Sequence, residues 1–264
     1  MLHLSVLLII TPLKSICHQR FLRKLKKIML EVKNISKSFG AKKALDNVNF
    51  SIKKGQIAAL LGENGAGKST LLRILSGFYE ADSGSISLDK IDLKTERETF
   101  LHKIGYVQEI SALYGEMKVY EYLQFAANLR RLPAEEVLPQ IKKAVAQLEL
   151  QDVLWQKNET LSKGYKKRVE LAAMLLSEPE VLILDEPTEG LDPNQKYTLR
   201  QTIKKYAQNR TVIISTHTLE DVEALATQVL LLHKGVLEMD SDLATFKKTA
   251  DNDLLKSFRK MTEN

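Results

Sequence analysis

The chain has 264 residues, of which 27% are charged and 44% apolar. This composition excludes a disordered chain, a collagen-like repeat and a small disulfide-stabilised domain, and it suits one large domain or a domain with a subdomain. The formal charge of +6 comes entirely from residues 1–28, which carry six basic side chains and no acid. The other 33 basic and 33 acidic residues cancel, so composition gives no reason to expect nucleic-acid binding.

Residues 1–28 form a basic extension that allows two interpretations. Apolar side chains recur among its basic ones at roughly helical spacing, which would suit an amphipathic helix on an anionic membrane: Ile16, Phe21, Leu25 and Ile28. We favour a disordered or non-native extension, because Met29 opens a strand-like run. The apolar run Leu4–Ile10 is much shorter than the ~20 residues that span a bilayer, and the first charge follows it, unlike in a secretory signal.

Short apolar strands dominate the chain from Leu30 onward. Leu30–Ile35 and Asn47–Ile52 alternate apolar and polar residues, as half-buried antiparallel strands do. Nearly continuous apolar runs are typical of parallel strands buried on both faces, and they occur at Gln56–Leu61, Val181–Leu184, Val212–Ser215 and Val229–Leu232. Two further strands are predicted at Ser85–Leu88 and Ile104–Val107.

A helical block interrupts this series of strands. Residues from about Val119 to Leu176 are predicted to be helical almost throughout, with Pro133 and Pro139 as interruptions. The order predicts an α/β fold with a mostly parallel sheet, an N-terminal antiparallel β subdomain and an inserted α-helical subdomain over about 111–170. The charged tail over 241–264 is also predicted to be helical.

A glycine-rich loop lies between the strand Gln56–Leu61 and a predicted helix, and it matches the pattern G-x-x-x-x-G-K-[ST]. Glycines let the backbone wrap closely around a phosphate, and successive N–H groups point inward at the positive end of the helix. The lysine can reach the β- and γ-phosphates, and the serine hydroxyl can bind Mg²⁺. A plain glycine-rich turn would not explain these two residues. We therefore predict a phosphate-binding loop of Gly62, Glu63, Asn64, Gly65, Ala66, Gly67, Lys68 and Ser69, with a helix from Thr70.

Two carboxylates end the apolar strand Val181–Leu184. Ligands in α/β proteins bind beyond the carboxyl ends of the strands, so this edge suits a site. Asp185 is predicted to hold Mg²⁺ directly or through water, as in other P-loop nucleotide triphosphatases (NTPases). Glu186, on the opposite side of the pleat, can accept a proton from an attacking water. Solvated acids at a strand end would look the same in isolation, and the phosphate loop favours the metal site.

Together these residues resemble the ATP-binding-cassette (ABC) ATPase family. The matching motifs occur in the family's order and span about residues 30–235. They are Phe39 as the adenine-stacking aromatic, Gln108 as the Q-loop, Leu161-Ser162-Lys163-Gly164-Tyr165 as the signature, Gly190-Leu191-Asp192-Pro193 as the D-loop and His217 as the switch histidine. The usual signature is Leu-Ser-Gly-Gly-Gln, so Lys163 and Tyr165 depart from it.

The resemblance implies a P-loop NTPase core over residues 29–240 that binds ATP and Mg²⁺. It implies catalytic roles for Lys68, Gln108, Glu186 and His217, and metal contacts from Ser69, Gln108 and Asp185. It implies ATP contacts from Phe39, the phosphate loop, Thr70, Ser162, Gly164 and Asp192. In the family, Ser162 and Gly164 of one subunit close over ATP held by a second subunit, here expected to be an identical copy.

The implied function is ATP hydrolysis that energises a membrane permease. The residues of the signature and D-loop segments resemble those of exporter-type cassettes most, so an exporter is favoured. The chain is expected on the cytoplasmic face of the cell membrane, attached only through that permease. Apolar residues near the Q-loop are candidates for docking the permease, or for ordinary subdomain core: Ile110, Leu113, Tyr114, Tyr120 and Tyr122. A soluble ABC ATPase acting on ribosomes or DNA and a non-catalytic regulator are the alternatives. Cargo and the direction of transport stay open.

Overall fold

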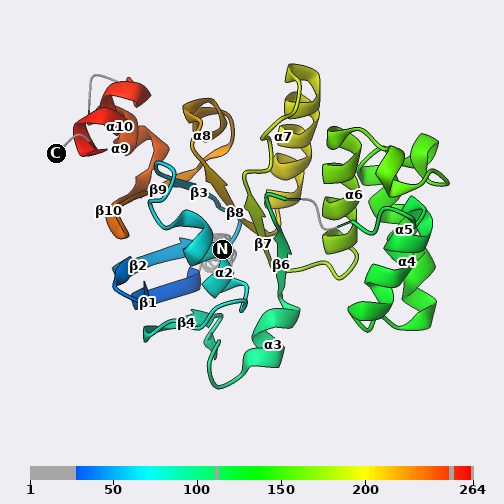
Figure 1. Cartoon of the computed structure of the whole chain (residues 1–264), viewed down its shortest axis with the longest axis horizontal. Coiled ribbons are helices and arrows are strands. Elements are labelled where there is room, and N and C mark those ends of the chain that lie inside the picture. Colours follow the sequence, from blue (N-terminus) through cyan, green and yellow to red (C-terminus); the bar gives the residue numbers. More distant parts are fainter. Residues whose placement is uncertain (1–27, 111–112, 250–252, 263–264) are drawn as a thin grey trace, which may run out of the picture.

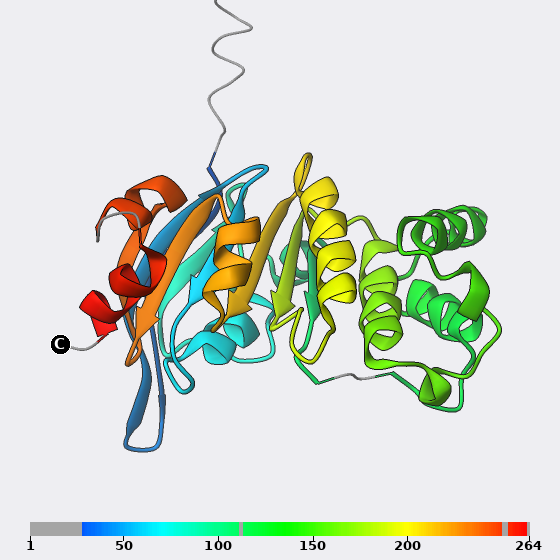
Figure 2. The same cartoon turned by 90° about the horizontal axis from the view of Figure 1, so that it is seen from above.

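The computed structural model describes residues 28–110, 113–249 and 253–262. The basic extension predicted at residues 1–28 therefore lies almost entirely outside the described residues. Two sheets form the centre of the molecule, with a group of helices at one end and the C-terminal helices at the other (Figures 1 and 2).

The first sheet is antiparallel and has the strand order β2-β1-β4-β5. Its strands are β1 (Ile28–Phe39), β2 (Lys42–Lys53), β4 (Ser83–Leu88) and β5 (Ile91–Asp92). Apolar side chains at alternate positions of β1, such as Leu30 and Val32, are buried, whereas Lys33 is exposed. This alternation is the pattern that predicted half-buried strands.

The second sheet has the order β10-β9-β3-β8-β7-β6. Its strands are β3 (Ile57–Leu61), β6 (Ile104–Val107), β7 (Val181–Asp185), β8 (Thr211–Thr216), β9 (Gln228–His233) and β10 (Val236–Asp242). All pairings are parallel except that between β9 and β10. Strand β10 was not predicted from the sequence, because this edge strand is half exposed and its residues do not form the apolar run that marks its neighbours.

Each buried strand of the second sheet contributes to two separate cores. Ala58, Leu60 and Ile183 face α2 (Lys68–Leu75) and the antiparallel sheet. Ala59 and Leu182 face the other side. There they pack with helices that include α7 (Pro193–Ala207) and α8 (Leu219–Leu225). Burial on both faces explains why these strands read as continuous apolar runs.

The inserted helices are α4 (Val119–Leu129), α5 (Ala134–Gln147) and α6 (Lys163–Leu175), with 3₁₀ turns at Gln151–Val153 and Asn158–Thr160. Pro133 precedes α5, as predicted, but Pro139 lies inside α5, so the expected interruption there is wrong. Helix α3 (Arg97–His102) precedes β6, and α9 (Leu243–Lys248) and α10 (Leu254–Thr262) follow β10. Within the described ranges, no helix is both long and apolar enough to cross a bilayer.

Candidate nucleotide site

The glycine-rich loop connects β3 to α2, and two of its glycines are required by close backbone approach. A Cβ on Gly62 would lie 2.3 Å from the Leu232 carbonyl oxygen. Gly67 has φ +107°, and a Cβ there would lie 2.6 Å from the Ala44 carbonyl oxygen. Any other residue would push the loop away from these carbonyls or strain it. The glycines therefore hold the loop in its wrapped conformation against β9 and β2.

Lys68 lies folded back inside this loop. Its Nζ donates to the carbonyl oxygens of Gly62 at 2.7 Å and Glu63 at 3.1 Å, and the residue is only 6% exposed. Burial lowers the pKa of Lys68, while Glu186, Asp185 and Glu109 act in the opposite direction. Lys68 Nζ also lies 3.9 Å from Glu186 Oε1. A cation is thus held at the floor of the loop, facing the two carboxylates that end β7.

Asp185 ends β7 and is held by neighbouring strands. Its carboxylate is buried and accepts hydrogen bonds from the Ser215 hydroxyl and, at 3.3 Å, from the Tyr106 hydroxyl. Burial, with a further contribution from the charge of Asp185, raises the pKa of Tyr106 to about 12. Because Tyr106 lies in β6 and Ser215 in β8, both strands that flank β7 fix this carboxylate.

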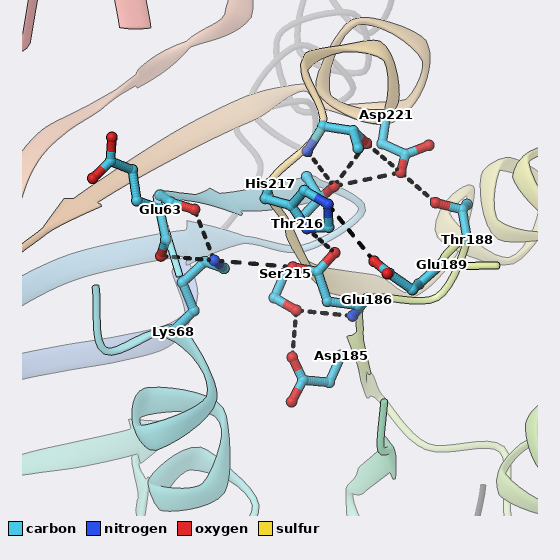
Figure 3. A network of polar contacts seen from close by, with 12 residues as sticks. Glu63, Lys68, Asp185, Glu186, Thr188, Glu189, Ser215, Thr216, His217 and Asp221 are labelled. Atoms are coloured by element: carbon cyan, nitrogen blue, oxygen red, sulfur yellow. Dashed lines mark hydrogen bonds and ion pairs between the residues drawn. The ribbon is translucent and has the colours of Figure 1, made fainter. Parts of the chain in front are cut away.

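Glu186 and His217 meet one residue beyond the ends of β7 and β8 (Figure 3). His217 Nδ1 lies 3.1 Å from Glu186 Oε2, and His217 Nε2 lies 3.7 Å from Glu189 Oε2. Glu186 has φ +45°, a left-handed conformation that costs a non-glycine residue about 1–3 kcal/mol. The Glu186 N–H donates to the Ser215 hydroxyl at 2.9 Å, which helps to hold this turn. The strained turn directs the carboxylate towards both Lys68 and His217.

Lys68, Glu186 and His217 line one cavity of about 310 Å³, whereas Asp185 lies behind it and is not part of the lining. Its lining includes Phe39, Ser69, Thr70 and the predicted loop residues Glu63, Asn64, Gly65, Gly67 and Lys68 with Glu186 and His217. Phe39 is 46% exposed and contacts the edge of Tyr79 with ring centroids 5.5 Å apart. Gly62 and Ala66 belong to the same loop but do not line the cavity. The cavity is also lined by four residues that were not predicted from the sequence: Lys42, Ala44, Glu109 and Glu189.

The donor set fits a magnesium nucleotide. The loop is shaped by close glycine contacts, Lys68 supplies a cation, and Ser69 lines the cavity. Asp185, fixed at the end of β7, supplies the carboxylate oxygen that Mg²⁺ prefers. Phe39 offers a partly exposed aromatic face at the cavity's edge, as a purine ring requires.

Gln108 does not line this cavity. It lines a larger one, of about 730 Å³, together with residues from α3, α4 and α6 that include Tyr122 and Met174. Lys167, on α6, donates through Nζ to the Gln108 carbonyl oxygen at 2.8 Å and to that of Glu109. Adjacent residues Gln108 and Glu109 therefore face two different cavities, and the sequence did not indicate the lysine that holds them.

Ser162, Gly164 and Asp192 also lie outside the cavity that contains Lys68. Ser162 caps α6 by accepting a 3.4 Å hydrogen bond from the Tyr165 N–H. Gly164 lies against α7, where a Cβ would come within 2.6 Å of the Gln195 side chain. Asp192 caps α7 by accepting the N–H groups of Asn194 and Gln195 at 2.9 Å.

Figures 1 and 2 place the helical group that contains α6 beyond β6 and β7 from α2. The signature residues and the phosphate loop are therefore at separate places in one chain.

A phosphate loop, an acidic strand end and a buried parallel sheet define a P-loop nucleotide triphosphatase. The family model described as ABC transporter matches residues 45–189, which is more than half of the chain. The chain therefore belongs to the ATP-binding subunits of ABC transporters, which are ATP-hydrolysing enzymes.

Relatives and solved structures agree with this assignment. The lantibiotic transport ATP-binding protein SrtF of Streptococcus pyogenes is 36% identical over 218 residues, covering 81% of this chain and 92% of SrtF. The energy-coupling factor transporter ATP-binding protein EcfA2 of Clostridium tetani is 38% identical over 210 residues, covering 76% and 73%. The dimeric structure of MJ0796, described as a bacterial ABC transporter cassette, superposes with a TM-score of 0.73 at 25% identity, covering 81% of this chain and 99% of that one.

Proposed function

We propose that this chain hydrolyses ATP to drive an ABC exporter from the cytoplasmic face of the cell membrane. The observation that carries this proposal is the convergence of Lys68, Glu186 and His217 on the cavity that the phosphate loop forms. A loop that only bound nucleotide would need the lysine, but it would not need a strained glutamate paired with a histidine.

The proposed chemistry is attack of water on the γ-phosphate, with catalysis by positioning and charge stabilisation. Glu186 accepts a proton from the water and His217 orients Glu186 and the γ-phosphate. Lys68 exchanges its carbonyl partners for phosphate oxygens and neutralises their charge. Ser69 and Asp185 hold Mg²⁺, which supplies further neutralising charge when bound.

Two copies of the chain are proposed to assemble around ATP. Ser162 and Gly164 stand at the start of α6, and the N-terminus of a helix attracts anions, yet both residues lie outside their own chain's phosphate cavity. Their place suits contact with ATP held by a second copy, and Asp192 would lie at the same junction. The superposable cassette described as dimeric supports this arrangement.

The membrane partner is proposed to dock beside the larger cavity. Gln108 and Tyr122 line it, and Ile110 and Tyr114 nearby are 80% and 56% exposed. Leu113, Tyr120 and Tyr122 pack partly against the core, so they are less available to a partner than Ile110 and Tyr114. Gln108 would then report docking to the phosphate site through Glu109, and would reach Mg²⁺ only after moving from its present place.

The exporter assignment rests on the sequence of the signature and D-loop segments and on the similarity to a lantibiotic transport protein. The energy-coupling factor relative is 38% identical and the lantibiotic relative 36%, so the preference for an exporter rests mainly on the signature and D-loop residues. Copurification from detergent-solubilised membranes tests the assignment: an export permease should copurify with the chain. Recovery of ribosomes or DNA instead would favour a soluble ABC ATPase.

Steady-state ATPase assays on Glu186→Gln test the catalytic proposal. We expect turnover to fall by about 10²–10⁴-fold, because the variant loses the general base, while ATP still binds. Glu96→Gln is the matched control, because Glu96 is an exposed glutamate before α3. This variant should hydrolyse ATP at the wild-type rate. Unchanged turnover in Glu186→Gln would reject Glu186 as the base.

A further inference from the structure

Asp221, in the short helix α8, is a buried carboxylate outside the phosphate cavity. It is 2% exposed. Its Oδ2 accepts hydrogen bonds from the hydroxyls of Thr188 and, at 2.9 Å, Thr218, with the Thr216 hydroxyl at 3.4 Å. Its Oδ1 accepts from the Arg200 guanidinium, with Nε at 2.8 Å. We call Asp221, Arg200, Thr188, Thr216 and Thr218 the Asp221 cluster.

The Asp221 cluster joins the two segments that carry the catalytic pair. Thr188 lies in the turn after β7, two residues beyond Glu186, and Thr216 and Thr218 flank His217. Figure 3 shows Asp221 bonded to both segments, with the contact between Glu186 and His217 close by. Ser215 makes a second link, since its hydroxyl accepts the Glu186 N–H. The catalytic contact thus lies between two cross-links.

Neither catalytic side chain is fixed by packing alone. The His217 side chain is 41% exposed, and Glu186 sits on a left-handed turn that must be held in place. A contact of 3.1 Å between Nδ1 and Oε2 is lost if either segment moves by about an ångström, a displacement that costs catalysis about 10²-fold. The segments therefore need a rigid link between them, and Asp221 makes hydrogen bonds to both.

We propose that Asp221 positions Glu186 against His217 for hydrolysis, and that Arg200 supports it by compensating the buried carboxylate. The inference rests on the proposed catalytic role of Glu186. It makes Asp221 a positioning residue, since it acts through the two turns without lining the phosphate cavity.

A purely structural ion pair would have a different signature. Loss of a buried pair partner leaves an uncompensated charge and lowers the stability of the whole domain. ATP binding and hydrolysis would then fall together, in proportion to the unfolded fraction. A positioning role instead lowers kcat, while KM and ATP affinity stay near their wild-type values, because the phosphate loop is untouched.

The test compares Asp221→Asn with Glu220→Gln. These neighbouring acids both accept from Arg200, but Glu220 is exposed and bonds neither catalytic segment in the described structure. We expect kcat of Asp221→Asn to fall by about tenfold to a hundredfold, with KM and equilibrium ATP affinity within about twofold of the wild type. Glu220→Gln should match the wild type in all three.

Thr188→Val keeps the Asp221–Arg200 pair and removes one hydrogen bond to the Glu186 turn. It therefore tests the positioning role of Asp221 even if Asp221→Asn folds poorly. We expect a kcat loss of about threefold to tenfold with unchanged KM. In the double variant Asp221→Asn/Thr188→Val the two losses of kcat should not add, because both substitutions act through the contact between Glu186 and His217.

Wild-type kcat in Thr188→Val and in folded Asp221→Asn would overturn the proposal, as would a parallel loss of ATP affinity. Glu186→Gln is assayed alongside. If it retains turnover, the catalytic assignment itself fails. If it is inactive while the two cluster variants match the wild type, only the positioning role fails.

Discussion

The phosphate end and the signature end of this chain are built differently. At the phosphate end, the segments that follow β3, β7 and β8 place Lys68, Glu186 and His217 around one cavity, and Asp185 is held at the end of β7 beside them. At the signature end, Ser162 and Asp192 serve as helix caps and lie outside that cavity. One chain therefore brings the phosphate-end residues together by itself, whereas the proposed role of the signature residues requires a second copy.

The largest expected effect breaks the phosphate end. In Gly67→Ala, the new Cβ would lie 2.6 Å from the Ala44 carbonyl oxygen at φ +107°. We expect ATP affinity, measured by equilibrium titration, to fall by about tenfold to a hundredfold, which corresponds to a loss of about 1.4–2.8 kcal/mol in binding free energy. Gly65→Ala is the comparison, because that glycine also has positive φ but no atom within 4 Å of its Cβ position. Equal losses in the two variants would argue against the steric cradle.

The next effect isolates the signature end. Aspartate caps helices as well as serine does, so Ser162→Asp should keep the start of α6 and the stability of the fold. It also places a negative charge where the phosphates of a partner's ATP are expected, an arrangement that costs several kcal/mol. We expect turnover to fall at least about tenfold while single-chain ATP affinity is retained. Ser162→Asn, an uncharged cap, is the control. Wild-type turnover in Ser162→Asp would contradict the role proposed for the signature.

The smallest effect touches neither end. The Lys143 ammonium lowers the pKa of Glu178, so this pair stabilises the fold above the ordinary pKa of 4.5, and the stabilisation is lost as pH falls through the lowered pKa. Lys143→Met should therefore lower the free energy of unfolding near pH 7 by no more than about 1 kcal/mol, because the pair is largely exposed. The deficit should vanish in acid, as followed by urea denaturation at several pH values.

The exposed neighbour Lys142 provides the control substitution, Lys142→Met. A deficit in Lys143→Met that grows in acid would contradict the sign of this prediction. ATP hydrolysis should be unaffected in both variants, which would set the baseline for changes at the phosphate and signature ends.

The features that depend on neighbouring residues in the chain could be predicted from the sequence. Continuous apolar runs identified the buried strands, and the glycine pattern followed by Lys68 and Ser69 identified the phosphate loop. Pro139 was misjudged because a proline beyond the first turn usually breaks a helix, and the packing of α5 against α4 and α6 overrides that preference here.

Long-range contacts could not be predicted in the same way. The sequence motif favours Gln108 as a residue of the phosphate cavity, yet in the structure its neighbour Glu109 lines that cavity and Gln108 lines the larger one. Asp221 is one acid among several in α8, and nothing local distinguishes it from Glu220. Its partners Thr188 and Arg200 lie 33 and 21 positions away, so its role emerges only when the sheet brings these segments together.

The magnesium dependence of ATP binding tests the central claim most directly. The claim is that the glycine loop and the carboxylate at the end of β7 converge on one triphosphate. ATP affinity is titrated with Mg²⁺ and with EDTA for the wild type, Ser69→Ala and Asp185→Asn. The account predicts that Mg²⁺ tightens binding by the wild type and that each substitution removes this gain while leaving affinity in EDTA unchanged. An undiminished magnesium gain in both variants would contradict it.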